Sequence, residues 1–166
     1  MARDNATFAG KNALDERVES YSEEVYRKFD YDRTIGKAPQ FGRYYYPAMV
    51  ASCTDRVQTM CCDSFARNPI IKEYCLTKMK EEMEQTFNLL QIGYDALKTS
   101  SHHRFPIGQC AEQHAANELM FSIKQKNAAY YDQMRVKNDI YFSKAIRPST
   151  GEDFDYCRNC HQLFDL

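Results

Sequence analysis

The chain has 166 residues, of which only six are glycine and five are proline. Glycine alone averages about 7% of residues in proteins, so this composition argues against a turn-rich all-β architecture. Lysine and arginine number 22 and aspartate and glutamate 23, a formal net charge of −1, which argues against a protein that binds polynucleotides through a large positive excess.

Cysteine usage and the N-terminal sequence indicate a reducing compartment. Seven cysteines are an odd number and a smaller share than the roughly 8–10% typical of small disulfide-rich domains. Residues 1–19 are polar throughout, unlike a signal peptide, and no run approaches the ~18 apolar residues of a membrane span. We therefore expect a soluble single domain with no membrane partner.

The first predicted element is an amphipathic helix over residues 12–29. Apolar side chains recur there at steps of three and four residues, as on one face of a helix; they are Leu14, Val18, Tyr21, Val25 and Phe29. The following residues 30–43 contain Gly36, Pro39 and Gly42 without a period, which predicts a loop.

Two further helices are predicted in the next segment. Pro47 suits the first turn of a helix, whose apolar side would be formed by Val50, Cys53, Val57, Met60 or Cys61, and Phe65. Asn68 and Pro69 predict the start of another helix, with an apolar side that includes Cys75, Met79, Met83, Phe87 and Leu90. Four cysteines would then be core thiols: Cys53, Cys61, Cys62 and Cys75.

The C-terminal part is predicted to combine a helix with a strand. After a polar loop, the Ala- and Glu-rich segment from Cys110 to Met120 is a good helix former. Residues 139–146 alternate and are rich in β-branched and aromatic side chains, and residues 148–151 read as a turn. We divide the chain into a helical part, 1–98, and a motif-bearing part, 99–166. The apolar helix faces need a partner surface, so the two parts should form one integrated domain.

Three cysteines outside the helical stripes are candidates for metal binding. Cys157 and Cys160 form a C-x-x-C pair, whose short spacing lets two thiolates bind one tetrahedral ion. On its own, such a pair also fits a redox site. Cys110 begins a helix and Glu112 follows two residues later; with a strand and a distal C-x-x-C, this is the arrangement of a zinc deaminase. A helix N-terminus also favours the thiolate form of Cys110.

The C-terminal part resembles the cytidine deaminase-like superfamily, and most closely the deaminase domains of bacterial polymorphic toxins and their eukaryotic relatives. The likeness rests on the segments 108–116 (GQCAEQHAA), 142–148 (FSKAIRP), Thr150-Gly151 and Cys157-x-x-Cys160, and spans about a third of the chain. It implies an α/β fold, namely an α-β-α sandwich with a helical N-terminal extension. We expect its C-terminal end to be short, since six residues follow Cys160.

The same resemblance implies a zinc enzyme. Cys110, Cys157 and Cys160 would hold Zn²⁺, water would take the fourth position, and Glu112 would be the catalytic proton shuttle. The reaction would be the hydrolytic deamination of a nucleobase in DNA, RNA or a free nucleoside, with cytosine favoured over adenine. The resemblance also implies a toxin or effector that acts in the cytoplasm or after delivery, with an immunity protein as partner.

A closed structural zinc site is the alternative. His114 lies four residues after Cys110, so these two residues with Cys157 and Cys160 would complete a tetrahedron of protein ligands. His161 is a less well placed candidate for the fourth position, because it directly follows a ligand. Such a protein would be a non-enzymatic binding or scaffold module, and the acidic residue of the motif an ordinary surface carboxylate.

Substrate contacts are predicted from position alone. His102 and His103 precede Cys110 in a loop of the kind that borders deaminase pockets, with a plain solvated loop as the alternative. Lys144 and Arg147 flank the predicted strand and would contact the phosphates of a polynucleotide. The alternative for these two cations is a solvated face.

Overall fold

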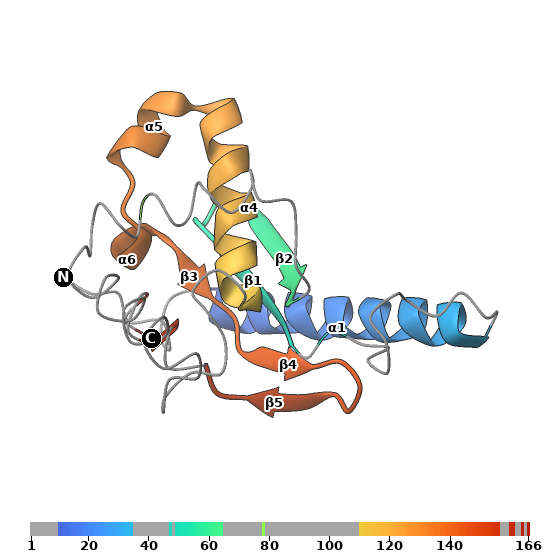
Figure 1. The fold of residues 1–166 in the computed structure, drawn as a ribbon. Coiled ribbons are helices and arrows are strands. Elements are labelled where there is room, and N and C mark those ends of the chain that lie inside the picture. The colour runs from blue at the N-terminus through green and yellow to red at the C-terminus, as the bar shows by residue number, and fades with distance from the viewer. Residues whose placement is uncertain are drawn as a thin grey trace, which may run out of the picture.

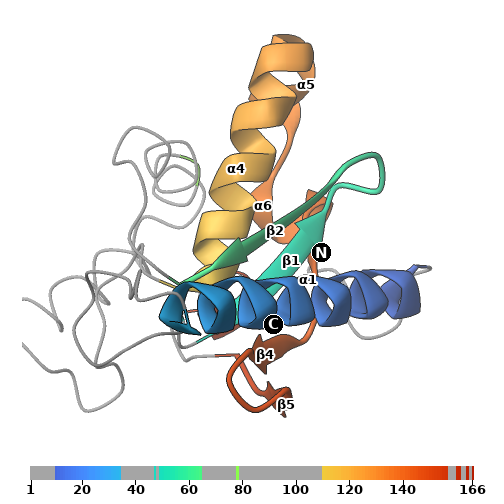
Figure 2. The same cartoon turned by 90° about the vertical axis from the view of Figure 1, so that its right-hand side faces the viewer.

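The computed structural model describes residues 10–34, 47, 49–64, 78, 110–156, 160, 161, 164 and 166. Within these ranges the protein has a mixed α/β fold, in which a small antiparallel sheet lies between two long helices (Figures 1 and 2). Helix α1 (Lys11–Thr34) covers one face of the sheet and helix α4 (Ala111–Lys126) the other. The described helices include none with the length and apolar character needed to cross a bilayer.

The sheet is built around its central strand β1 (Val50–Thr54). The strand order is β2-β1-β4-β5, and β3 also pairs with β1. All pairs are antiparallel. The bounds of the other strands are Thr59–Asp63 for β2, Tyr141–Phe142 for β3, Ala145–Arg147 for β4 and Glu152–Phe154 for β5. Two short helices, α5 (Ala128–Gln133) and α6 (Val136–Asp139), connect α4 to β3.

Side chains of the sheet form a separate core with each helix. On the α4 face, Cys53 and Phe142 pack with Leu119 and other buried residues of that helix. On the α1 face, Val50 and Ile146 pack with residues of α1 that include Val18. Successive residues of a strand point to opposite faces, and a helix covers each face of this sheet. Strand β1 is therefore buried along its whole length.

An extra residue interrupts the strand beside β1. Cys53 pairs with Phe142, but three residues earlier Val50 pairs with Ile146, so residues 143–145 lie opposite only two residues of β1. This is a β-bulge. In a regular strand, Phe142 and Ile146 would share a face because they are four residues apart. The bulge sends Phe142 to the α4 core and Ile146 to the α1 core.

The N-terminal turn of α1 binds the backbone at this bulge. The amide of Lys144 donates to Asp15 Oδ1 (2.9 Å), and Lys11 Nζ donates to the same oxygen (3.1 Å) and to the carbonyl of Phe142 (3.1 Å). The Ser143 hydroxyl accepts a hydrogen bond from a backbone N–H of β1 (2.9 Å). The peptide groups that the bulge removes from regular pairing are thus satisfied by α1 and by Ser143.

The helix predicted over residues 12–29 is confirmed as α1, but the helix predicted from Pro47 is wrong. Residues 50–63 form the β1–β2 hairpin. Val50, Cys53 and Val57 match a helical period by coincidence, because a strand buried on both faces shows no polar alternation. The turn is closed by Asp55, whose Oδ1 accepts from two amides of the turn (2.9 and 2.8 Å).

The remaining predicted elements agree in part with the structure. The helix from Cys110 is confirmed and extends to Lys126. The predicted strand 139–146 is broken into β3 and β4, and the turn at 148–151 is confirmed. Cys53 and Cys62 are buried in the core as predicted, although on strands, and Cys61 is half-buried. The helix predicted after Pro69 lies outside the described residues, apart from Lys78, and Cys75 also lies outside them.

The position of β1 makes a prediction about separability. Residues 99–166 expressed alone should give an unfolded or aggregated chain, because β3 and β4 would lose the strand with which they pair. Circular dichroism and thermal melting of the fragment test this. A soluble fragment with a cooperative melt would contradict it.

A second prediction concerns the bulge. Asp15→Ala should lower the free energy of unfolding by about 1–3 kcal/mol, because it removes a charged acceptor from the Lys144 amide and from Lys11. The neighbouring Glu16→Ala, at an exposed position of the same helix, is the matched control. Urea denaturation of both variants makes the comparison, and equal midpoints would refute the role of Asp15.

Candidate metal centre

The candidate site is built on the N-terminal turn of α4. Cys110 is the N-cap residue of this helix, with extended backbone angles (φ −72°, ψ 147°), and its carbonyl accepts the first helical hydrogen bond from the His114 amide (3.0 Å). Glu112 lies in the first turn. Because the backbone of Cys110 is extended and that of Glu112 is helical, the two side chains can point to the same place although they are only two residues apart.

The first turn of α4 is polar in sequence but buried in the structure. Glu112 is 4% exposed, Gln113 2% and His114 3%. Burying such groups costs free energy unless they find hydrogen-bonding partners or ligands. Partners are present for all three: Cys160 for Glu112 and Gln113, and the Asp63 carbonyl for His114.

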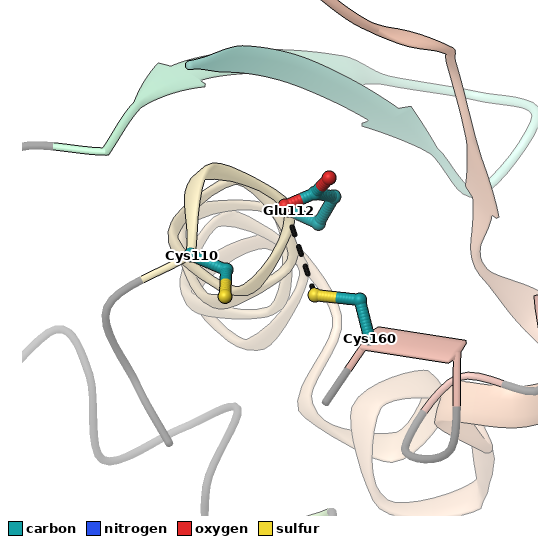
Figure 3. Close-up of side chains that lie close together, drawn as sticks. All are labelled: Cys110, Glu112 and Cys160. Carbon is teal, nitrogen blue, oxygen red and sulfur yellow. Dashed lines mark hydrogen bonds between the residues drawn. The ribbon is translucent and has the colours of Figure 1, made fainter. Parts of the chain in front are cut away.

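Two of the predicted thiols meet Glu112 here. One ligand atom each from Cys110, Glu112 and Cys160 lies within 4.8 Å of the other two (Figure 3). Cys160, which is fully buried, donates its thiol to Glu112 Oε2 at 3.7 Å. Gln113 Nε2 donates in turn to the Cys160 sulfur, also at 3.7 Å. The group joins two segments about 50 residues apart in the chain.

The donor atoms and their spacing fit a zinc ion. Two thiolates bound to one tetrahedral zinc ion at about 2.3 Å lie roughly 3.8 Å apart, and the ligand atoms of Cys110, Glu112 and Cys160 lie within 4.8 Å of one another. The two sulfurs are the preferred zinc ligands of this group, and the carboxylate lies beside them. The third predicted thiol, Cys157, lies outside the described residues. The cluster as described can hold a metal ion.

His114, the fourth ligand of the closed-site alternative, does not join this cluster. Its Nδ1 lies 3.1 Å from the carbonyl oxygen of Asp63 at the end of β2, and the described group comprises Cys110, Glu112 and Cys160. The rule that residues four apart share a face applies within a helix. Cys110 is an extended cap residue, so its side chain leaves in another direction.

His161 is bound to the C-terminal segment. Its Nδ1 lies 2.6 Å from the carbonyl of Leu166, and its Nε2 lies 3.4 Å from Asp155. The Tyr156 ring meets the imidazole edge-on, with centroids 5.7 Å apart. Both ring nitrogens of His161 thus have partners away from the cluster.

Two of the four predicted substrate contacts, Lys144 and Arg147, have partners on α1 and β5. Lys144 Nζ donates to Glu19 of α1 and to Asp153 of β5. The hydrogen bond to Glu19, chiefly, raises the pKa of Lys144 above its ordinary value, so this cation is engaged in an ion-pair network. Arg147 lies over the Phe154 ring, 4.3 Å from its centroid. His102 and His103 lie outside the described residues.

Sequence reasoning missed two residues that support the cluster. Gln113 donates to the Cys160 sulfur, and the Tyr156 hydroxyl donates to the carbonyl of Ser143 in the bulge (2.7 Å). The second contact fixes the chain immediately before the C-x-x-C. Gln113 had a signal in the sequence, because it is the middle one of three consecutive polar residues in a helix that is otherwise Ala-rich. Tyr156 had none, because its partner is a backbone group 13 residues earlier.

Comparisons with known proteins identify no relative: no protein-family model, no curated protein and no solved structure matches the chain.

The cluster predicts a stoichiometric metal. Protein purified under reducing conditions should contain about one zinc per chain, and Cys160→Ser or Cys110→Ser should lower zinc affinity by at least tenfold, because each removes a thiolate. Cys61→Ser is the matched control. Burial raises the pKa of the Cys61 thiol, which keeps it protonated, and it lies on β2 away from the cluster. Metal analysis and competition with a chromogenic chelator measure the effect, and a folded, metal-free wild-type protein would contradict the prediction.

Proposed function

We propose that the protein is a zinc-dependent hydrolytic deaminase of a nucleobase, with cytosine as the preferred base. One observation carries the proposal: a buried carboxylate and two thiols meet at the N-terminus of a helix, with Glu112 Oε2 3.7 Å from the Cys160 sulfur. The helix–sheet–helix arrangement supports it, because it is compatible with the deaminase-like sandwich that the motifs imply.

The reaction replaces the exocyclic amine of the base by oxygen. Water adds to the ring carbon, the C–N bond breaks and ammonia leaves, so that cytosine and water give uracil and ammonia. Zinc, when bound by Cys110, Cys160 and the C-x-x-C partner Cys157, supplies a nucleophile by acidifying water near neutral pH.

The part of Glu112 in this proposal is to move protons. In the structure its Oε2 accepts a hydrogen bond from the Cys160 thiol. When that sulfur is a thiolate ligand it no longer donates, and Oε2 can accept a proton from water and pass it to the ring nitrogen and the leaving amine. Glu112 is only 4% exposed, and electrostatic contacts are stronger in such a buried position than in water.

The position of Gln113 supports the same reading. An N–H···S hydrogen bond to a ligand sulfur orients the thiolate and tunes its basicity, and Gln113 Nε2 makes this contact to Cys160. With Cys160 as a ligand, Gln113 supplies a buried supporting contact behind it. The toxin or effector role, with an immunity protein as partner, rests on the motif resemblance and belongs to the same proposal.

Glu112→Gln tests the proposal. The variant retains shape and an acceptor oxygen for Cys160, so fold and zinc content should persist. Deamination should fall by at least ~10²-fold, the usual effect of losing a positioned general base. The measurement is ammonia release and sequencing-detected base conversion on cytosine- and adenine-containing DNA, RNA and nucleosides, beside zinc content and thermal melting.

His114→Asn is the matched control and tests the closed structural site. Asparagine can keep the donor that faces the Asp63 carbonyl while removing the second imidazole nitrogen. Zinc content should be unchanged in the catalytic case. Loss of zinc in His114→Asn together with an unaltered Glu112→Gln would replace the deaminase by a scaffold with structural zinc.

A further inference from the structure

A cavity lies on the side of the sheet that faces α1, separate from the cluster of the candidate metal centre. It has a volume of about 300 Å³ and is formed by the start of α1 and the β1–β2 hairpin. Its lining consists of Gly10, Ala13, Leu14, Arg17, Thr54, Arg56 and Thr59. The cluster of Cys110, Glu112 and Cys160 is built on α4, which covers the opposite face, so this cavity is distinct from the candidate metal centre.

Among the described residues, the lining includes two arginines and no acidic residue. Arg17, Arg56 and Thr59 are all exposed, so their polar groups are open to a ligand from solvent. Arg17 forms an ion pair with Glu24, with 3.9 Å between the guanidinium nitrogen and the carboxylate oxygen. Both side chains are about half exposed or more, and ion pairs between exposed side chains are weak. Asp55 lies beside Arg56 in sequence, but its carboxylate is occupied by two backbone amides of the turn.

The backbone at Arg56 holds its side chain in a defined place. Arg56 has a φ of 76°, and it is the only described residue other than glycine whose φ is positive. Hairpin positions of this kind normally carry glycine, asparagine or aspartate, because other side chains are strained there. The Arg56 amide donates to the Thr54 hydroxyl (3.0 Å), and its guanidinium lies 4.6 Å from the centre of the Tyr141 ring. Arg56 thus has a strained backbone conformation and a side chain held by stacking on an aromatic ring. Strained residues of this kind cluster at functional sites.

We propose that this cavity binds a phosphomonoester. Such a group carries a charge of about −1.5 to −2 at neutral pH, which two guanidinium groups balance, and its oxygens match the forked N–H donors of arginine. The Thr59 hydroxyl supplies a further donor. Resting on the proposed function, the carriers of the phosphate to test are a free nucleotide and the 5′ end of a nucleic acid chain.

Calorimetric titration tests the site. The full-length protein at about 50 mM salt, where screening is modest, should bind inorganic phosphate and a nucleoside 5′-monophosphate. Arg17→Gln should weaken binding roughly tenfold, and the double variant with Arg56→Gln roughly a hundredfold, because each removes charged hydrogen bonds. Arg27→Gln removes the same charge from α1 outside this cavity and should leave affinity unchanged.

Arg56→Gly separates binding from folding. Glycine adopts a positive φ without strain, so this variant should keep or raise the melting temperature while binding about tenfold more weakly. A 5′-phosphorylated oligonucleotide and its unphosphorylated counterpart identify the source of the phosphate: competition by the phosphorylated chain alone indicates a strand end, and no competition by either indicates a free nucleotide.

Two results would overturn the site. One is the absence of binding of both phosphate and the monophosphate by the wild-type protein. The other is an equal effect of Arg17→Gln and Arg27→Gln, which would indicate attraction by overall charge. Neither result bears on zinc content or on deamination, because the two sites share no residue.

Discussion

The bulge beside β1 is the constraint on which the rest of the structure depends. One additional residue between Phe142 and Ile146 turns these two side chains to opposite faces of the sheet. Each face then has an apolar surface for one helix, α4 on Phe142 and α1 on Ile146. A regular strand would place both on one side and leave the other helix without a full core. The Lys144 amide donates to Asp15 and Lys11 donates to the Phe142 carbonyl, and these hydrogen bonds compensate the irregular backbone.

The candidate metal centre depends on the same region through two connections. The first is Tyr156, whose hydroxyl binds the Ser143 carbonyl and so fixes the chain just before the C-x-x-C. The second is Phe142, whose ring packs against Phe164 with centroids 4.5 Å apart, anchoring the chain after Cys160. The C-terminal thiol is therefore positioned by contacts on either side of it, and the N-terminal turn of α4 is positioned by the sheet below.

Some of this could be predicted from the sequence and some could not. Helix α1 could, because its apolar side chains follow a helical period and its other faces are charged. The β1–β2 hairpin could not, for two reasons. Strand β1 is buried on both faces and shows no polar alternation, and the turn carries Arg56 at a position where glycine or asparagine would have indicated a chain reversal. Asp55 was the available signal, because its carboxylate closes the turn. The grouping of Cys110 with Glu112 followed from closeness in sequence at a helix start. The approach of Cys160 depends on tertiary contacts that no local pattern encodes, and it was expected from the motif resemblance.

Strand β5 has a consequence for how the molecule behaves among its own copies. Among the described strands it forms one border of the sheet, and the peptide groups at such a border are where a strand from another chain can add on. The border is only three residues long and carries Glu152 and Asp153, both exposed, with Asp153 held by Lys144. An incoming strand would have to bring its own side chains against these carboxylates along a very short run of hydrogen bonds. This end of the sheet is thereby protected from intermolecular β-aggregation.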